Sequence, residues 1–294
     1  MNQSRYEKSR ELTIIVFLFF ISFLLCSIVV AKEPLELNTS LMEATFKLQG
    51  KNSTGTAFII GRPTKQDPTK GHFVLVTAAH VLEEMQGSQA QLILRKKRKD
   101  GRYARFPYSI KIRQDGKPLW IHHDDKAVDV AAMYVALPKD MNITLLPIHF
   151  LADDTTLSEF EIHPGDQLMC LGYPFGAEAN EAGFPILRSG KIASYPLIPT
   201  KQTKTFLYDF QIFKGNSGGP VYFVESGRTY EGSMHVSTIQ FIAGLVSKEW
   251  EVVEEFKGLY EEKKERHPLG LAQVVHAIFI KETIEKLPEL GYGL

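Results

Sequence analysis

The stretch Gly215-Asn216-Ser217-Gly218-Gly219-Pro220 places one serine among glycines, directly before the apolar run Val221–Val224. A serine hydroxyl is a poor nucleophile at neutral pH, so it needs a neighbouring base and donors for the oxyanion that it creates. Glycines let the backbone turn tightly, which allows N–H groups to converge on one point. The stretch therefore predicts a nucleophilic serine, Ser217. The alternative is a glycine-rich turn with an incidental serine.

Two stretches upstream contain the residue types that such a serine needs. Val76–Val81 reads Val-Thr-Ala-Ala-His-Val and contains His80, and Val128–Ala132 reads Val-Asp-Val-Ala-Ala and contains Asp129. The order histidine, aspartate, serine is that of a chymotrypsin-type triad. Taken singly, His80 could be a buried core residue and Asp129 could cap a turn.

On these three motifs the chain resembles the trypsin/chymotrypsin-like serine peptidases over about residues 41–288. Asn216, where the animal digestive enzymes carry aspartate, is nearer to the bacterial HtrA-like branch, and we expect a member without a PDZ domain. The resemblance implies an all-β fold of two six-stranded antiparallel barrels with a C-terminal α-helix, and neither a cofactor nor a metal.

The resemblance also implies a role for each site residue. Ser217 attacks a peptide carbonyl, His80 moves the proton, and Asp129 orients the imidazole. The backbone N–H groups of Gly215 and Ser217 form the oxyanion hole. Because Asn216 is neutral, it cannot form an ion pair with a newly freed N-terminus, which argues against activation of the digestive zymogen kind.

The substrate pocket implied by the resemblance involves Gln211, Ile212 and Ser247. Gln211 stands where trypsin-like members carry an acidic residue, and Ile212 would narrow the pocket. We therefore expect cleavage after small or medium uncharged residues.

Composition excludes some partners. The chain has 294 residues and a formal net charge of zero, so it has no global attraction to nucleic acid, and we expect protein or peptide substrates. It has two cysteines, Cys26 in an apolar N-terminal run and Cys170 in the body. Removal of the first segment would leave no intramolecular disulfide. The oligomeric state is not predictable from the sequence.

The N-terminus has the pattern of an export segment. Arg5, Lys8 and Arg10 precede Leu12–Ala31, a run without charge. The run is either a signal peptide cleaved after Ala31 or an uncleaved signal anchor. Both alternatives place the body outside the cytoplasm, either periplasmic or secreted, or anchored to the inner membrane through residues 12–31.

The rest of the chain reads as short strands separated by turns. We expect a linker at 32–42, an N-terminal barrel at 43–145 and a C-terminal barrel at 146–294 with a closing helix, together forming one peptidase domain. Trp250–Arg266 is an insertion whose apolar spacing suits either a helix or a long hairpin.

Two charged stretches have plain alternatives. The basic run Arg95–Lys99 is either a solvated hairpin tip or a patch for an anionic partner. His122–Asp125 has metal-ligand residue types, but we interpret it as a solvated loop because no second cluster completes a site.

Three functions are compatible with the motifs. The first is an exported serine endopeptidase that acts through an acyl-enzyme. The second is a catalytically silent or latent relative that serves as a binding module. The third is an esterase or another acyl transferase with the same triad.

Overall fold

The computed structural model describes residues 35–64, 71–138, 141, 143–257 and 262–290, with the side chains of 257, 262 and 263 excluded. The predicted export segment, residues 1–31, lies outside these residues. Leu37–Leu294 forms one compact unit. Among the described residues, no helix is long and apolar enough to cross a membrane.

Eight strands form the first sheet, in the order β5-β4-β1-β2-β3-β9-β8 with β10 paired to β2. Its central strand β2 is buried from Gly55 to Gly61 and pairs with β1 along one edge and with β3 along the other. The strands are β1 (Thr45–Gln49), β2 (Thr54–Pro63), β3 (Gly71–Thr77), β4 (Gln89–Lys97), β5 (Tyr103–Lys111), β8 (Ile121–His122), β9 (Ala131–Tyr134) and β10 (Leu146–Pro147). A two-stranded ribbon, β6 (Arg113–Gln114) and β7 (Lys117–Pro118), lies apart from this sheet.

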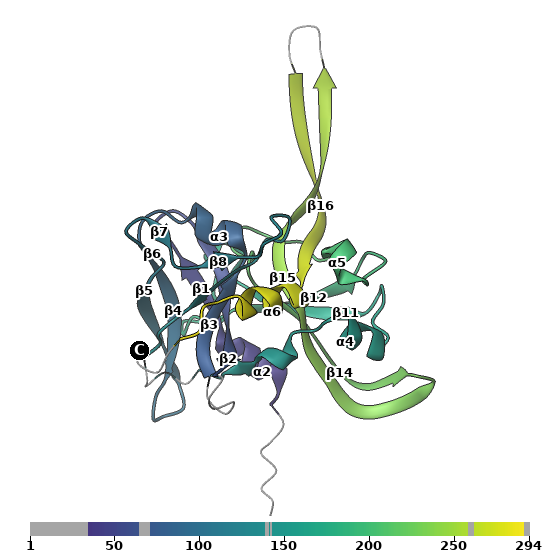
Figure 1. Ribbon diagram of the computed structural model, residues 1–294, viewed down its shortest axis with the longest axis horizontal. Helices are drawn as coiled ribbons and strands as arrows, with labels where there is room; N and C mark the ends of the chain where they lie inside the picture. Colours follow the sequence, from purple (N-terminus) through teal and green to yellow (C-terminus); the bar gives the residue numbers. More distant parts are fainter. Residues whose placement is uncertain (1–34, 65–70, 139–140, 142, 258–261, 291–294) are drawn as a thin grey trace, which may run out of the picture. The chain divides into compact units, whose positions relative to one another are not determined.

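The second half of the chain forms a closed antiparallel barrel in the order β11-β12-β13-β16-β15-β14 (Figure 1). Its apolar side chains, among them Phe206, Phe223 and Phe241, form one buried cluster inside the barrel. The strands are β11 (Gln167–Gly172), β12 (Ile186–Ile192), β13 (Thr205–Asp209), β14 (Pro220–Tyr230), β15 (Ser233–Lys257) and β16 (Glu262–His276).

The helices are short. They are α2 (Leu37–Ala44), α3 (Ala79–Glu84), α4 (Asp154–Glu159), α5 (Thr200–Thr203) and α6 (Ala277–Glu285), with 3₁₀ turns η1 (Ile148–Phe150) and η2 (Pro174–Gly176). Helix α6 buries Phe279, Ile280 and Ile284. Helix α2 corrects the expected linker at 32–42, because Leu37 and Leu41 are fully buried and fix this segment to the body.

The all-β class, the chymotrypsin-like architecture and the closing C-terminal helix are confirmed. The expected six antiparallel strands per half hold for the closed barrel. The first half instead has eight strands, and its β10–β2 pair is parallel. The division at residues 145 and 146 stays a prediction, and β10 at Leu146–Pro147 pairs with the first sheet.

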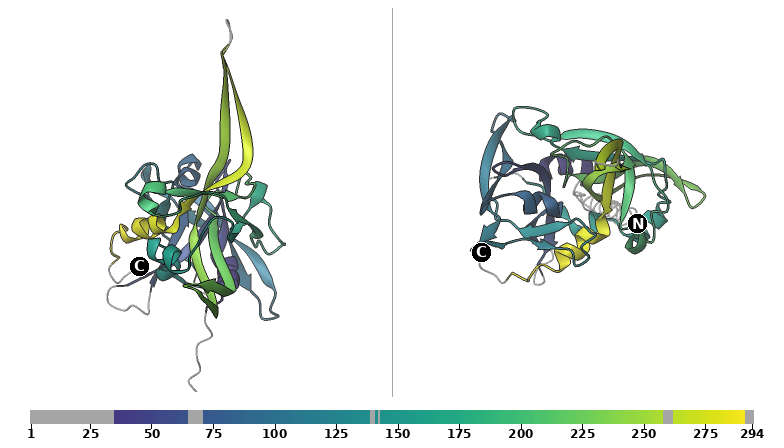
Figure 2. Two further views of the ribbon diagram at one scale, coloured as in Figure 1. Left: turned by 90° about the vertical axis from the view of Figure 1, so that its right-hand side faces the viewer. Right: turned by 90° about the horizontal axis from the view of Figure 1, so that it is seen from above.

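The insertion at Trp250–Arg266 is a hairpin. The pairing of β15 with β16 continues from the barrel to the pair Lys257↔Glu262. The two strands project from the body as an arm, which we define as residues 249–257 and 262–270 (Figures 1 and 2). Of the two expected alternatives, the hairpin is the one observed. Its apolar residues keep no two-residue period, because a register shift occurs at Trp250/Glu251 and because Val253 and Phe256, three positions apart, lie on opposite faces of the ribbon.

Arg95 joins the two halves and is not part of an exposed basic patch. Its guanidinium donates to the carbonyl oxygens of Glu43, Thr45 and Gly183 at 2.8–3.0 Å. It also lies 4.5 Å from the ring centroids of Phe46 and Phe184. Only residues 96–99 of the run are exposed, so the expected exposed basic stretch begins at Lys96 and not at Arg95.

Candidate active site

His80 and Asp129 are brought together by two neighbouring strands. His80 lies at the start of α3, directly after β3, and Asp129 lies directly before β9, which pairs with β3. The Nδ1 atom of His80 is 2.7 Å from Oδ2 of Asp129, and the backbone N–H of His80 donates to Oδ1 at 3.1 Å. Because an ionised carboxylate only accepts, Nδ1 carries the proton, and Nε2 of a neutral ring is an acceptor.

Each member of this pair stabilises the charged form of the other. Burial lowers the pKa of His80, but the hydrogen bond and charge of Asp129 outweigh burial and hold that pKa above its ordinary value of 6.5. Burial raises the pKa of Asp129, but the hydrogen bond and charge of His80 hold that pKa below its ordinary value of 3.8. Asp129 is therefore ionised at neutral pH.

Ser247 is a third member of this arrangement. Its hydroxyl donates to Oδ2 of Asp129 at 2.6 Å and contributes to the lowered pKa of that carboxyl. The sequence had placed Ser247 in the substrate pocket only. The signal for this contact is a polar residue that directly follows the buried run Phe241–Val246.

The Ser217 loop packs against β2 and against the end of β3, the strand that leads to His80. The backbone N–H of Thr56 donates to the carbonyl oxygen of Ser217 at 2.9 Å. Gly218 has a φ of 84°, and a Cβ there would lie 2.2 Å from both the carbonyl oxygen of Thr56 and the hydroxyl of Thr77, and 3.0 Å from the Ala78 nitrogen. Only glycine allows this close approach, which brings Ser217 to the segment that ends in His80.

The other side of the same loop is tied to the closed barrel. The N–H of Gly218 donates to the carbonyl of Val246 at 2.8 Å, and the N–H of Val246 donates to Gly219 at 2.9 Å. The next residue, Ser247, contacts Asp129. One framework therefore holds the serine loop, the carboxylate and the imidazole. Ser217 and His80, both described, make no direct hydrogen bond, a contact that often forms only when substrate is bound.

The N–H groups of Gly215 and Ser217 have no acceptor within the described part of the chain. Gly215 has a φ of 102°, and its carbonyl accepts from the Thr56 hydroxyl at 2.7 Å, which fixes the orientation of the peptide. A Cβ at Gly215 would lie 2.2 Å from the carbonyl oxygen of Tyr173. Two backbone donors without an internal acceptor suit an oxyanion that forms at Ser217.

The family model of the trypsin-like peptidase domain matches residues 55–229. The chain belongs to this family. Its match contains His80, Asp129 and Ser217 and spans both halves of the fold. No protein with a curated description matches the chain.

Solved structures similar to this trypsin-like peptidase include two bacterial proteins. An inactive form of Rv3671c from M. tuberculosis H37Rv is 15% identical, with a TM-score of 0.44, covering 90% of this chain and 97% of that chain. The protease Anisep from Arthrobacter nicotinovorans is 14% identical, with a TM-score of 0.46, covering 83% and 94% respectively.

The expected pocket residues of the peptidase differ in exposure. Gln211 is exposed, whereas Ile212 is buried. Arg188 was missed in the sequence. Its guanidinium donates to the Gln211 carbonyl at 2.7 Å and lies 4.2 Å from the ring centroid of Phe210. A strand residue from β12 thus holds the segment that precedes the Ser217 loop.

A cavity of about 990 Å³ opens beside the His80–Asp129 pair. Ser247 and Lys248 of β15 line it from the closed barrel, and His122 lines it from the first half. The cavity reaches His80 and Asp129.

The stretch His122–Asp125 is tied down by α6 and its neighbours. His123 is buried, and its Nε2 is 3.0 Å from a carboxylate oxygen of Glu282 on α6. Lys286 pairs with Asp124 at 2.6 Å, and Lys204 pairs with Asp125 at 2.6 Å. Our interpretation of a solvated loop is therefore wrong for His123, whose partners hold the loop that leads to Asp129.

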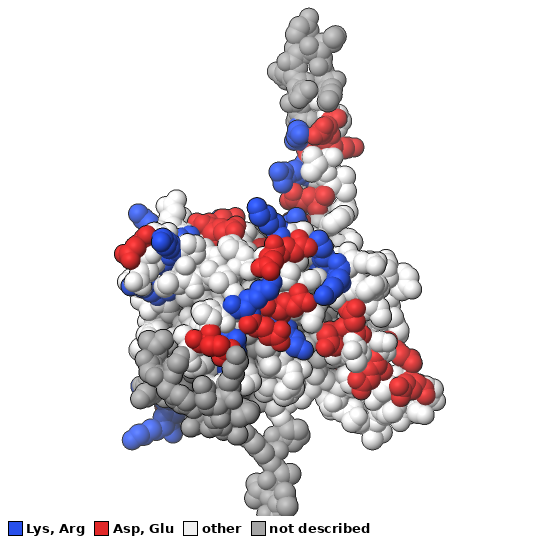
Figure 3. Space-filling model, in the orientation of Figure 1, with Lys and Arg blue, Asp and Glu red and all other residues white. Residues whose placement is uncertain are grey.

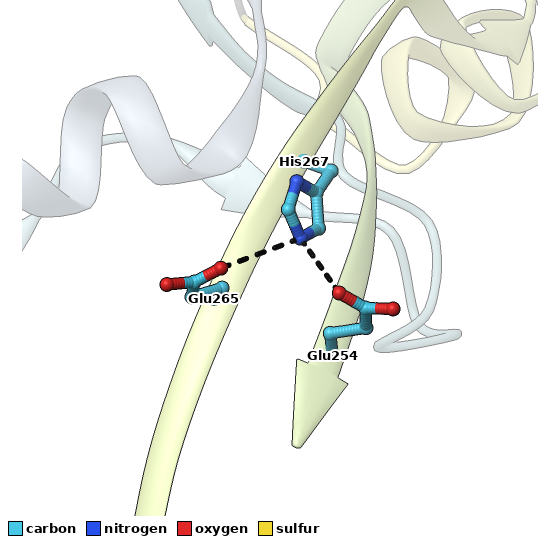
Figure 4. Close-up of side chains that lie close together, drawn as sticks. All are labelled: Glu254, Glu265 and His267. Carbon is cyan, nitrogen blue, oxygen red and sulfur yellow. Dashed lines mark hydrogen bonds and ion pairs between the residues drawn. The ribbon is translucent and has the colours of Figure 1, made fainter. Parts of the chain in front are cut away.

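One group of the described side chains has metal-ligand types at close range. Ligand atoms of Glu254, Glu265 and His267 on the arm lie within 4.8 Å of one another (Figure 4). Nε2 of His267 is 3.2 Å from Glu254 and 4.0 Å from Glu265. Glu254 and His267 are largely exposed and Glu265 half-buried, and the charges of an ion-paired ribbon account for all three.

Proposed function

We propose that the chain is a serine endopeptidase that acts through His80, Asp129 and Ser217. The observation that carries this proposal is the shared framework: the residue that follows Val246 bonds to Asp129, while Val246 itself bonds to the Ser217 loop. Membership of the trypsin-like peptidase family supports protein or peptide substrates.

The chemistry follows from the geometry of the pair. His80 Nε2 takes the proton of the Ser217 hydroxyl as the oxygen attacks the carbonyl carbon, and Asp129 stabilises the imidazolium. The N–H groups of Gly215 and Ser217 bind the oxyanion. When the tetrahedral species collapses, His80 gives the proton to the leaving amine and an acyl-enzyme remains. Water activated by His80 then hydrolyses the ester and regenerates Ser217.

The cleavage preference also belongs to this proposal. Ile212 is buried beside exposed Gln211, and neither offers a negative charge to a basic residue. We propose cleavage after small or medium uncharged residues. Cleavage of a peptide library chiefly after arginine or lysine would contradict this preference.

The location of the protein is a further part of the proposal. The basic start and the uncharged run Leu12–Ala31 support export, with the body in the periplasm, secreted, or anchored outward at the inner membrane. Fractionation of cells that express the full chain tests this, and recovery in the cytoplasm would contradict it.

Labelling of the full chain with a fluorophosphonate tests the central claim. We expect labelling of the wild type and none of Ser217→Ala, because the probe reacts with an activated serine. His80→Ala should lose most of the labelling, since the hydroxyl then lacks its base. Equal labelling of the Ser217→Ala variant would show that another residue reacts.

A silent or latent binding module is the second candidate. The observation that favours it is the lack of a direct hydrogen bond between Ser217 and His80, both within the described residues. A folded wild type that neither labels nor cleaves would support this candidate. An esterase would label as a peptidase does, so hydrolysis of esters without cleavage of any peptide would identify it.

A further inference from the structure

The arm exposes both of its strand edges. On β15, pairing with β14 stops at Leu245, the partner of Pro220. On β16, pairing with β13 stops at Leu271, the partner of Asp209. Beyond these points the two strands pair only with each other. Within the described part of the chain, no backbone hydrogen bond joins residues 247–256 to a segment outside this ribbon. Free strand edges are templates for an added strand.

The β15 edge begins at the candidate catalytic centre, whereas the β16 edge does not. Val246 exchanges backbone hydrogen bonds with the Ser217 loop, and Ser247 bonds to Asp129. From there β15 runs outward along the arm without a break in its pairing with β16, apart from register shifts. A polypeptide whose carbonyl lies at Ser217 therefore meets the start of a long free edge.

The two edges of the arm differ in charge. Figure 3 shows acidic side chains gathered on one side of the arm and basic ones on the other. On β15 the stretch from Ser247 to Phe256 carries the four acidic residues Glu249, Glu251, Glu254 and Glu255 and one basic residue, Lys248. The described side chains of β16 include Lys264, Arg266 and His267, which pair across the ribbon with Glu255, Glu251 and Glu254. One acidic side chain, Glu265, lies among them on β16. Glu249 has no ion-pair partner among the described residues.

We infer that the β15 edge from Ser247 to Phe256 is an extended docking site for the substrate, which adds as an antiparallel strand and carries basic residues. This inference rests on the proposed peptidase function and deepens it. Apolar side chains on the same strand, Trp250, Val252, Val253 and Phe256, are 41–48% exposed and offer contact area to the added chain.

Antiparallel addition determines whether the residues before or after the cleaved bond lie on the arm. Every ladder of the closed barrel is antiparallel, and antiparallel pairing is the more stable kind. Because β15 runs outward from Ser247, the added chain must run inward toward Ser217. The residues upstream of the cleaved bond therefore lie along the arm. A strand rises roughly 3.3 Å per residue, so the edge accommodates about nine residues.

The substrate must be extended over this length. A folded loop cannot present so many backbone groups to one edge, so the site selects unfolded segments or chain ends. Exposed ion pairs contribute little singly, so we expect the charge preference to be modest and sensitive to salt.

A series of peptides tests the inference on the full chain. A cleaved sequence is first chosen from a random decapeptide library. Peptides are then made with two, four, six or eight residues upstream of the cleaved bond. In each length, alternate positions far from the bond carry either lysine or glutamate. We expect kcat/KM to rise about tenfold in total from two to eight residues, from the usual strength of cross-strand contacts. We expect lysine peptides to exceed glutamate peptides by about three- to tenfold at low salt only.

A shortened arm supplies the matched variant. Trp250 and Leu271 are strand partners, so an Asn-Gly turn can replace residues 251–270 and close the hairpin there. The ratio of kcat/KM for the longest to the shortest peptide should fall to about one. The control is Glu159→Gln with Glu231→Gln, which removes two exposed acidic groups away from the arm and should keep the ratio.

The outcomes separate the two proposals. Cleavage with no dependence on upstream length in the wild type would overturn the inference and leave the peptidase function standing. Failure of both cleavage and fluorophosphonate labelling would overturn both. If sedimentation shows that shortening the arm converts a dimer to a monomer while the length ratio is kept, the edge binds a second copy and the inference is wrong. Should the shortened chain not fold, the length and charge series on the wild type decides alone.

Discussion

At the scale of single residues, the candidate site depends on a few contacts that allow no substitution. Asp129 accepts from the His80 ring, the His80 backbone and Ser247. Gly218 lies where any side chain would collide with Thr56 of β2 and with Thr77 at the end of β3.

The pH dependence of activity should follow His80. The base must be neutral to act, and Asp129 holds the pKa of His80 above 6.5 although burial lowers it. We therefore expect kcat/KM to fall with decreasing pH, with a midpoint above 6.5. Asp129→Asn should lower that midpoint and reduce kcat by about 10⁴-fold, because the imidazole loses its tautomer partner. A profile that is flat between about pH 5 and 8 would contradict the mechanism.

Gly218→Ala should damage both stability and the site. The positive φ costs about 1–3 kcal/mol, and the collisions with Thr56 and Thr77 add to it. Urea denaturation should show the loss, and fluorophosphonate labelling should fall with it. Gly232→Ala is the control, since Gly232 also has a positive φ but a Cβ there meets nothing within 4 Å. It should cost about 1–2 kcal/mol and keep labelling. Equal losses in both variants would mean that strain alone matters.

At the scale of elements, strands from one half are fastened to loops of the other by buried polar groups. Arg95 on β4 reaches the carbonyl of Gly183 in the second half and the carbonyls of Glu43 and Thr45 near β1. Arg95, the first residue of the basic run, is therefore a buried structural residue.

Arg95→Met should destabilise the fold by about 3 kcal/mol or more, because several buried carbonyls lose a charged donor. Methionine fills similar volume, so the loss reports the hydrogen bonds and not a cavity. Arg98→Met is the matched control on the same strand-loop segment, where the side chain is exposed, and we expect a change within about 0.5 kcal/mol. Urea denaturation measures both. A small effect at Arg95 would show that water replaces the lost donor.

At the scale of the whole molecule, the closing helix α6 of the C-terminal half holds a loop of the first half. Its Glu282 accepts from buried His123, which lies on the loop that leads to Asp129. The His123 Nδ1 atom accepts from the backbone N–H of Asp125, so Nε2 must donate to Glu282.

Glu282→Ala should therefore loosen the loop that carries Asp129. We expect a loss of about 1–3 kcal/mol in unfolding free energy and a fall in kcat for a short peptide, because a buried donor loses its acceptor. Glu282→Gln retains a carbonyl oxygen as acceptor and should restore most of both. If the alanine variant keeps full kcat, the contact serves stability only.

The family, the β class and the candidate residues His80, Asp129 and Ser217 could be predicted from the amino-acid sequence. These depend on short local patterns: alternating apolar strands, and glycines required where a side chain would collide. Three features could not be predicted in this way. They are the contact of Ser247 with Asp129, the burial of Arg95 and His123, and the hairpin form of the insertion. Each depends on which distant segment lies opposite, as Glu282 does for His123. Local spacing carries no information on such partners. Whether a polar residue is buried, and whether an apolar run forms a helix or a strand, depends on the segments that pack against it.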